Sequence, residues 1–164
     1  MQSFEQFATE RAATLLRYAT ALTCDPDLAQ DVVQDTLLRV QPRWPRIGAM
    51  DAPLAYVKRM VTNEYLSWRR RKAVREISTG HGGVEVALAD PATDYDERDA
   101  MLARIAVLPP KQRATVVLRY YDNRTDAEIA EILGCRSGTV RSHLSHAMAA
   151  LRANDVVTTV KEGR

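Results

Sequence analysis

The positions of apolar residues predict an all-α chain. Along most of its length, apolar side chains recur at steps of three and four residues, which is the spacing along one face of an α-helix. Residues that cap or break helices mark where each run starts and stops. Together these signals predict helices over residues 4–23, 26–40, 53–75, 98–108, 111–121, 125–133 and 137–152.

Polar caps support the first two of these helices. Ser3 and Gln6 have the spacing of a capping box, in which two side chains satisfy free backbone amides at a helix start. Asp25 can cap the second helix, with Pro26 at its first position. Residues 41–52 contain two prolines and a glycine, so we expect an ordered loop there rather than a continuous helix.

The most specific pattern lies in residues 125–152, where two short amphipathic helices follow each other closely. Thr125 and Glu128 have the spacing of a second capping box, and Gly134 stands where a left-handed residue ends a helix. Ser137 can then cap the next helix. The caps, the glycine and the apolar stripe agree on a helix-turn-helix. The stripe of its second helix contains Val140, Leu144, Met148 and Leu151.

The outer face of that second helix carries short polar and cationic side chains, which can reach phosphates and base edges in a DNA major groove. An ordinary helical hairpin with a solvated face is the alternative interpretation. His143 and His146 have the spacing of a metal-binding pair, but no third ligand is near them in sequence, so we expect no metal. The DNA-binding candidates are Arg136, Ser137, Thr139, Arg141, Ser142, His143, Ser145 and His146.

Charge is distributed unevenly, although the net charge is only +2. Residues 1–40 hold 3 basic and 6 acidic side chains (net −3), and residues 41–76 hold 9 and 3 (net +6). Residues 77–99 hold 1 and 6 (net −5), and residues 100–153 hold 8 and 4 (net +4). Two basic regions separated by an acidic one predict two contacts with a polyanion.

The helix predicted from residue 53 combines cations with aromatic and amide side chains, which suits a DNA strand whose bases are accessible. A cationic helix end that interacts with the helix dipole is the alternative explanation for its basic run. Trp44, between two arginines, can pack into the core, which we favour, or stack on an unpaired base. The candidates on this side are Trp44, Lys58, Asn63, Trp68, Arg69 and Arg70.

The helix predicted over 26–40 has an unusual polar face. Asp31, Gln34, Asp35 and Leu38 follow one another at i, i+3, i+4 and i+7, so a polar stripe ends in an exposed leucine. This stripe is either a solvated acidic face or a docking surface for a basic protein partner.

Residues 76–97 have the composition of a flexible acidic linker, with few large apolar side chains and the tetrapeptide GHGG. We therefore expect two small helical domains, residues 1–75 and 98–153, followed by a frayed tail over 154–164. The linker's 22 residues could span at most about 75 Å, which would let the two domains occupy separate sites on one duplex.

Size and composition exclude several classes of protein. With 164 residues and 46% hydrophobic content the chain can form folded cores, and no apolar run approaches the roughly 20 residues that span a bilayer. The N-terminus lacks a signal-peptide pattern, so we expect a cytoplasmic protein without membrane association. Cys24 and Cys135 predict neither a disulfide framework nor a zinc site. We find no catalytic triad, metal cluster or phosphate loop, so we expect neither an enzyme nor a cofactor.

Four segments resemble, in the right order, the extracytoplasmic-function sigma factors of bacterial RNA polymerase. The resemblance runs from about residue 4 to residue 152 and is strongest to an actinobacterial subgroup similar to the SigE family. It implies a factor that binds core RNA polymerase, recognises the −35 and −10 promoter elements and promotes DNA melting without covalent chemistry. The segments are DLAQDVVQDTLLRV, YVKRMVTNEYLSWRRRK, LPPKQRATVVLRYY and DAEIAEILGCRSGTVRSHL.

The resemblance also implies roles for the candidate residues. The stripe from Asp31 to Leu38 would contact the clamp helices of the largest polymerase subunit. The helix-turn-helix would read the −35 element and rest on the polymerase flap, with His143 where the family often has an arginine. Trp44 and the basic helix around Asn63 would capture a flipped base of the melted −10 element. An anti-sigma protein is a further candidate partner.

The main alternative function is a dimeric helix-turn-helix regulator, which would sense a ligand or partner through an N-terminal helical domain. The acidic stripe, the aromatic and basic helix and the flexible linker are harder to explain for such a regulator than for a sigma factor.

Overall fold

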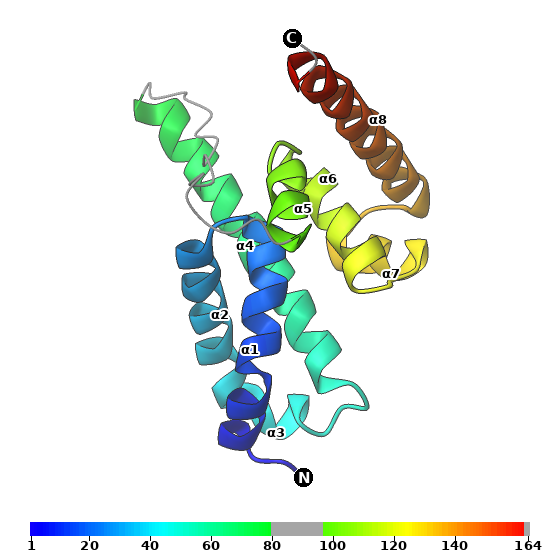
Figure 1. Cartoon of the computed structure of the whole chain (residues 1–164). Helices are drawn as coiled ribbons and strands as arrows, with labels where there is room; N and C mark the ends of the chain where they lie inside the picture. Colours follow the sequence, from blue (N-terminus) through cyan, green and yellow to red (C-terminus); the bar gives the residue numbers. More distant parts are fainter. Residues whose placement is uncertain (80–96, 163–164) are drawn as a thin grey trace. The chain divides into compact units, whose positions relative to one another are not determined.

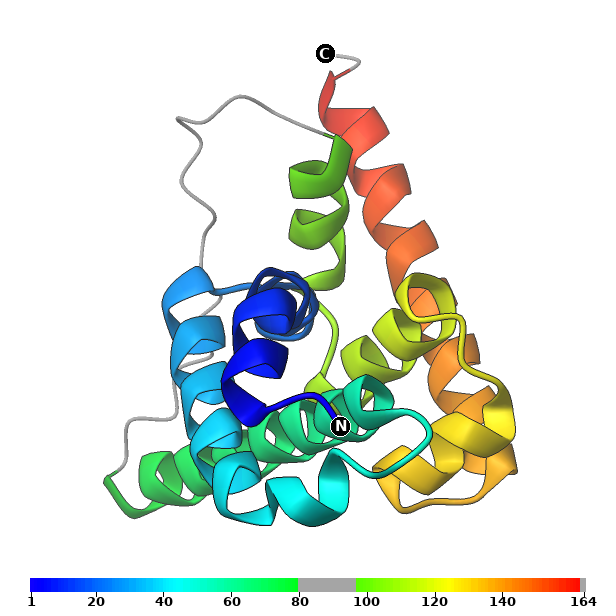
Figure 2. The same ribbon diagram turned by 90° about the horizontal axis from the view of Figure 1, so that it is seen from below.

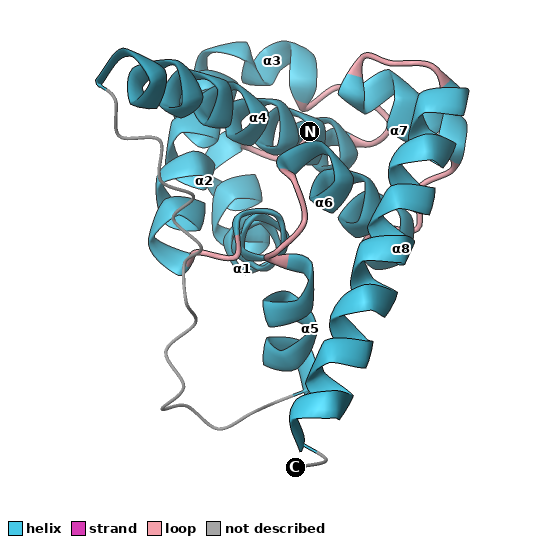
Figure 3. Cartoon of the chain, turned by 90° about the horizontal axis from the view of Figure 1, so that it is seen from above, coloured by secondary structure: helices cyan, strands magenta, loops and turns pink. Residues whose placement is uncertain are grey.

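The computed structural model describes residues 1–79 and 97–162, and within these ranges every regular element is a helix (Figures 1 and 3). The chain divides into two compact units, Met1–Val84 and Glu85–Arg164. Most of the predicted linker, residues 80–96, lies outside the described residues. Within the described ranges, no helix has both the length and the apolar character needed to span a bilayer.

The first unit is built on three long helices, α1 (Phe4–Thr23), α2 (Pro26–Val40) and α4 (Pro53–Thr79), which pack against one another (Figures 1 and 2). The apolar residues that recur at steps of three and four along these helices face one another in the core of the unit. This confirms the helices that their spacing predicted. The core includes Phe7, Leu15, Tyr18, Leu22, Ala29, Val32, Val33, Val57, Val61 and Tyr65.

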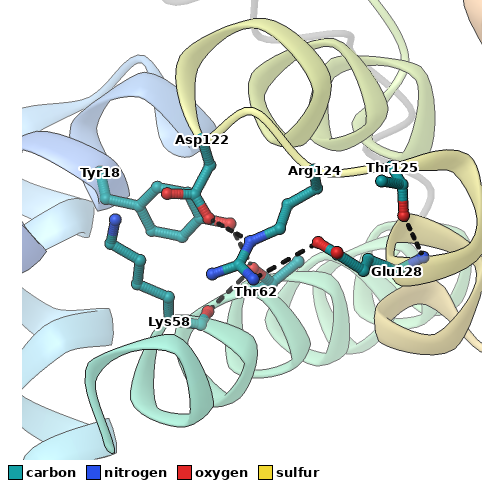
Figure 4. Close-up of polar contacts among 7 residues, drawn as sticks. All are labelled: Tyr18, Lys58, Thr62, Asp122, Arg124, Thr125 and Glu128. Carbon is teal, nitrogen blue, oxygen red and sulfur yellow. Dashed lines mark hydrogen bonds and ion pairs between the residues drawn. The ribbon is translucent and has the colours of Figure 1, made fainter. Parts of the chain in front are cut away.

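Polar atoms inside this core are paired. The Tyr18 and Thr62 hydroxyls lie 2.8 Å apart, and Thr62 Oγ1 donates to the Lys58 carbonyl at 2.9 Å (Figure 4). The Lys58 ammonium lies 5.4 Å from the centre of the Tyr18 ring. These contacts join α1 to α4 and remove the cost of burying a phenol without a hydrogen bond.

The predicted caps of the first two helices are confirmed. Ser3 Oγ accepts from the Gln6 amide at 3.1 Å, and the Gln6 side chain accepts from the Ser3 amide at 3.0 Å. Asp25 Oδ1 accepts from the amides of Asp27 and Leu28 at 3.0 and 3.2 Å. These bonds satisfy backbone donors that have no partner inside the helices.

The loop expected over 41–52 is instead largely helical. It forms the short 3₁₀ helix η1 (Gln41–Arg43) and the single turn α3 (Trp44–Ile47). Pro42 and Pro45 each stand in the first turn of a helix, where the missing amide hydrogen costs nothing. The prolines therefore start these two turns while still preventing one long helix.

Trp44 on α3 packs into the core of the first unit. It is only 6% exposed, its Nε1 donates to the Gln2 carbonyl at 2.9 Å, and its ring centre lies 4.7 Å from that of Phe7. The core-packing interpretation of Trp44 is therefore confirmed, and the inclusion of Trp44 among the DNA-binding candidates is wrong for this conformation. An indole held on both its apolar ring and its polar nitrogen is not free to stack on a base.

Gly48 makes room for this indole. A Cβ atom on Gly48 would lie 2.7 Å from Cε2 of the Trp44 ring, closer than side chains approach one another. We predict that Gly48→Ala destabilises the first unit by about 1 to 3 kcal/mol, because the ring must shift from its packed position. Thermal unfolding followed by tryptophan fluorescence would measure this. Unchanged stability would contradict the close packing described here.

The second unit contains α5 (Glu97–Ile105), α6 (Pro110–Val116), the π-helical turn η2 (Val117–Tyr121), α7 (Asp126–Leu133) and α8 (Ser137–Glu162). The first part of α8 packs against α6 and α7, as Figure 3 shows from above. One small core results, with Ile105, Leu108, Val117, Leu118, Ile129, Val140 and Ala147 buried.

The helix expected over 111–121 changes its winding at Val117. The Asp122 amide donates to the Val117 carbonyl at 3.1 Å, which is the i to i+5 bond of a π-turn. The wider turn changes which side chains face the core. Val116 and Val117 are buried, whereas Tyr120 and Tyr121 are 61% and 44% exposed.

The frayed tail expected from residue 154 is also wrong for most of its length, because α8 continues to Glu162. No glycine or proline interrupts residues 139–162, so nothing in the backbone stops the helix. Arg104 on α5 donates to Asp155 Oδ2 at 2.7 Å, which ties this extension to the rest of the unit.

A buried arginine holds the turn between α5 and α6. Arg113 is 7% exposed, and its Nε donates to the Ile105 carbonyl at 3.2 Å. Its Nη2 donates to the carbonyls of Ala106 and Leu108 at 2.8 and 3.1 Å. The guanidinium thus satisfies carbonyl groups at the end of a helix, a role that the sequence analysis did not predict.

Candidate nucleic-acid and protein interfaces

The helix-turn-helix is formed as predicted by α7 and α8, but two of its caps differ from the prediction. Thr125 Oγ1 accepts from the Glu128 amide at 3.2 Å, which is half of the expected capping box. The Glu128 carboxylate instead accepts from Arg124 at 3.4 Å. Ser137 is already inside α8, because the Arg136 carbonyl accepts the first bonds of the helix. Gly134 ends α7 in the left-handed region with φ +67°, as expected.

The segment that leads into α7 is fixed by ion pairs. Arg124 Nε donates to Asp122 Oδ2 at 2.9 Å, and this hydrogen bond is the main reason that the pKa of Arg124 is raised (Figure 4). Arg119 pairs with Asp126 at the start of α7. These pairs anchor the helix that precedes the candidate recognition helix.

The predicted recognition face of α8 is accessible. Ser137 and His143 are partly buried. The exposed candidates are Arg136, Thr139, Arg141, Ser142, Ser145 and His146.

His143 lies in a partly buried and locally positive environment. Partial burial lowers its pKa, and the positive charges of Lys111 and His146 lower it further. His143 is therefore mostly neutral at pH 7 in the free protein. At neutral pH it presents a neutral imidazole, which can both donate and accept a hydrogen bond.

This lowered pKa predicts how the second unit responds to acid. The folded state binds a proton at His143 less readily than the unfolded chain, so the free energy of unfolding should fall as the pH drops below about 6.5. His143→Gln should remove that part of the pH dependence. Calorimetric unfolding of both proteins at about pH 7.5 and about pH 5.5 would test this. An identical loss of stability in the variant would show that His143 is not the group responsible.

On α4, the structure brings only some of the predicted DNA-binding residues together. Asn63 and Arg70 are exposed and line a cavity of about 500 Å³ between α2 and α4. Lys58, Trp68 and Arg69 do not line it. The Trp68 ring instead faces Lys72, whose Nζ lies 5.3 Å from the ring centre. The other lining residues are Thr36, Arg39, Arg43, Met60, Glu64 and Ser67.

The wall of this cavity contains an ion pair that the sequence analysis missed. The Glu64 carboxylate is 6% exposed, and its Oε2 lies 2.6 Å from Arg39 Nη1 on α2. Arg71 Nη2 lies 3.5 Å from the other oxygen, Oε1. The sequence signal for this ion pair is Glu64 itself, an acidic residue within a strongly basic helix. Its partner Arg39 lies on another helix, so residue spacing could not identify it.

The stripe on α2 forms an accessible surface. Its four residues, Asp31, Gln34, Asp35 and Leu38, are all exposed, and Leu38 is 60% exposed. No ion pair joins Asp31 or Asp35 to another residue of the described ranges. Two carboxylates beside an exposed leucine can accept a basic protein surface that also carries an apolar residue.

Comparison with known proteins gives matches over both units. Residues 7–75 match the family model described as Sigma-70 region 2, and residues 98–151 match the model described as Sigma-70, region 4. The RNA polymerase sigma-E factor of Streptomyces avermitilis is 35% identical over 149 residues, which cover 91% of this chain and 83% of that protein. The ECF RNA polymerase sigma factor SigL of Mycobacterium tuberculosis is 36% identical over 147 residues, which cover 87% and 83% of the two chains.

A solved structure is also similar. It is the sigma factor RpoE in complex with the anti-sigma factor NepR from Bartonella quintana, with a TM-score of 0.67 and 25% sequence identity. The similarity covers 92% of this chain and 94% of that one.

Proposed function

The chain belongs to the sigma-70 family of RNA polymerase sigma factors, and from this membership we propose how its two units divide the work of transcription initiation. It is an alternative sigma factor of the extracytoplasmic-function type, which binds core RNA polymerase and promoter DNA. The first unit would engage the core enzyme and the −10 element, and the second unit would engage the −35 element. It would act in the cytoplasm, where RNA polymerase works, and catalyse no reaction itself.

One observation carries this division of labour. The chain has two chemically different accessible surfaces, an acidic stripe on α2 and a polar, cationic face on α8, and they belong to separate units. An acidic stripe repels DNA, so it suits a basic protein surface, whereas the α8 face suits phosphates and base edges. A single DNA-binding function would leave the stripe on α2 without a role.

The −35 element would be read by the helix-turn-helix. Arg141 and Ser142 are exposed on the first half of α8, the part of a recognition helix that enters the major groove. Arg136 and Thr139 flank them on the same accessible surface and can contact the phosphate backbone.

We predict that Arg141→Ala weakens binding to the −35 element by about 1 to 3 kcal/mol, because an arginine contact with a guanine edge is lost. Arg152→Ala is the matched control, since Arg152 is an exposed arginine about three turns further along α8. Binding of duplexes with altered −35 sequences would be measured by fluorescence anisotropy. A uniform weakening across all sequences would indicate a phosphate contact instead of base recognition.

The −10 element would be held by the first unit after melting. The cavity between α2 and α4 offers an amide, hydroxyls and cations, the groups that bind an unpaired base and its phosphates. Trp44 has no part in this proposal, because it is buried in the core.

The stripe on α2 would contact the clamp helices of the largest polymerase subunit, and the second unit would also rest on the flap. An anti-sigma protein is a possible competitor for these surfaces, since RpoE of Bartonella quintana has been solved with its anti-sigma factor NepR.

Size-exclusion chromatography with purified core RNA polymerase tests the function as a whole. We expect the protein to elute with the core enzyme at equal stoichiometry. The alternative, a dimeric helix-turn-helix regulator, predicts a dimer that elutes apart from the polymerase and binds a palindromic duplex.

A further inference from the structure

The cavity between α2 and α4 has an unusual chemical character for a surface that binds a polyanion. Arginines 39, 43 and 70 contribute its cationic part, and Met60 contributes an apolar side chain. Among the described residues that line it, Glu64 alone carries a carboxylate. A carboxylate at this position weakens the binding of phosphates, so phosphate binding does not explain its presence in the cavity.

Glu64 is held firmly in its place. Its side chain is 6% exposed, and the 2.6 Å contact with Arg39 links it to α2. Arg71 donates to Ser67 Oγ at 2.8 Å and lies 3.5 Å from Glu64 Oε1, so it steadies the carboxylate from the side of α4. The orientation of the carboxylate is therefore determined by residues on two helices.

The carboxylate keeps capacity for another hydrogen bond. A glutamate has two oxygens with about four acceptor sites, and only Oε2 has a short contact with a guanidinium. The contact of Oε1 with Arg71 is at the long limit of a hydrogen bond. Oε1 can therefore accept from a group that enters the cavity.

We propose that Glu64 is a specificity-determining residue, which makes this cavity select an unpaired DNA base with an exocyclic amino group on its Watson–Crick edge. Adenine, cytosine and guanine each carry such an amino donor, whereas thymine carries none and has two carbonyl oxygens beside its ring N–H. A carboxylate accepts from the amino group and repels the carbonyl oxygen. The inference rests on the proposed function, in which the first unit holds the melted −10 strand.

The neighbouring side chains are suited to the rest of such a nucleotide. The arginines that line the cavity can neutralise the phosphates on either side of the base, which offsets the repulsion from Glu64. The Asn63 amide can donate and accept, so it can bind either kind of base. Discrimination against thymine, the base without an amino group, is thereby left to Glu64.

The test uses the full-length protein assembled with core RNA polymerase. Promoter templates carry each of the four bases in turn at every position of the −10 element, and initiation is measured by counting transcripts. At one position we expect adenine, cytosine or guanine to support about tenfold more initiation than thymine. At that position, an analogue without the amino group, purine for adenine or 2-pyrimidinone for cytosine, should lose most of this advantage.

The variant Glu64→Gln provides the second arm. A neutral amide can donate as well as accept, so the preference should fall to within about twofold at that position and persist at the others. Arg71→Ala is the matched control, because it removes a partner of Glu64 but keeps the carboxylate, and it should retain the preference. If Glu64→Gln does not fold, the base analogues still decide the question with the unaltered protein.

The outcomes separate the two proposals. A holoenzyme that initiates but shows no amino-base preference at any position overturns the role of Glu64 and leaves the proposed function intact. The same conclusion follows if Glu64→Gln and Arg71→Ala lower initiation equally on all templates without changing the base ratios, since Glu64 would then be only a structural ion-pair residue. A protein that supports no initiation on any template overturns the proposed function itself.

Discussion

Replacing Arg113 with alanine is expected to lower the free energy of unfolding of the second unit by about 3 to 4 kcal/mol. The substitution removes the side-chain donor for the carbonyls of Ile105, Ala106 and Leu108, of which, among the described residues, only Ile105 keeps another partner, the Leu108 amide at 3.1 Å. Buried carbonyls without a partner each cost roughly 1 to 3 kcal/mol, and the arginine's own packing is lost as well. Small domains are stable by only about 5 to 15 kcal/mol, so this loss removes a large part of the stability of the unit that carries the helix-turn-helix.

Calorimetry of the variant, with binding to a −35 duplex as a second readout, measures this effect. Lys111→Ala is the matched control, because Lys111 is an exposed cation on the same helix and should change stability by less than about 0.5 kcal/mol. Arg113→Lys should be intermediate, since an ammonium lacks the planar fork that reaches several carbonyls. If Arg113→Ala were as stable as the control, the buried hydrogen bonds would not be holding the turn.

Replacing Asp31 and Asp35 together with alanine is expected to weaken binding to core RNA polymerase by about 3 kcal/mol, roughly 100-fold. Both carboxylates are exposed on one face of α2 beside Leu38, so their loss should leave the fold unchanged. The loss in affinity arises because basic groups of the partner would remain buried at the interface without a counter-charge. Binding of isolated −35 duplexes should be unaffected.

Affinity for the core enzyme would be measured by titrating labelled protein, with Glu5→Ala and Glu10→Ala together as the control. That pair removes the same two negative charges from exposed positions on α1. An equal loss in both double variants would mean that net charge matters and that the α2 stripe is not the docking surface. Comparable losses of core and DNA binding in the Asp31 and Asp35 variant would contradict the division between the units.

The helices of this protein could be predicted from the sequence because their signals are local. The capping box at Ser3, the cap at Asp25 and the left-handed Gly134 each depend on residues within one turn, and all three are found as expected. The apolar stripes of the first unit are buried in its core, whereas in the stripe predicted on α8 Val140 is buried and Leu144, Met148 and Leu151 are half-buried.

The differences arise where one local pattern fits two conformations. Prolines after residue 41 break a long helix, but they can also start short helices. The loop predicted over residues 41–52 followed from the first effect alone, whereas the structure shows the second. The π-turn at Val117 has no distinct sequence signal, and it exposes Tyr120 and Tyr121. The continuation of α8 past residue 154 runs through Val and Thr residues of low helix propensity, so local signals do not predict it, and the contact between Arg104 and Asp155 joins residues that are far apart in sequence.

The candidate surfaces show a similar limit. Faces of single helices, such as the α2 stripe and the α8 recognition face, could be listed from helical spacing and are accessible in the structure. Features formed by two helices could not be predicted in this way. The pairing of Glu64 with Arg39 and the burial of Arg113 against the end of α5 both depend on tertiary packing. The roles of the individual residues at these surfaces remain predictions.

Reconstituted transcription tests the central claim most directly. Core RNA polymerase, freed of other sigma factors, would be combined with this protein and a library of genomic templates, and the 5′ ends of the transcripts would be mapped. We predict starts that depend on the added protein and lie downstream of shared −35 and −10 elements. Transcription that is unchanged by the protein on every template, together with dimeric binding to a palindromic operator, would contradict the account.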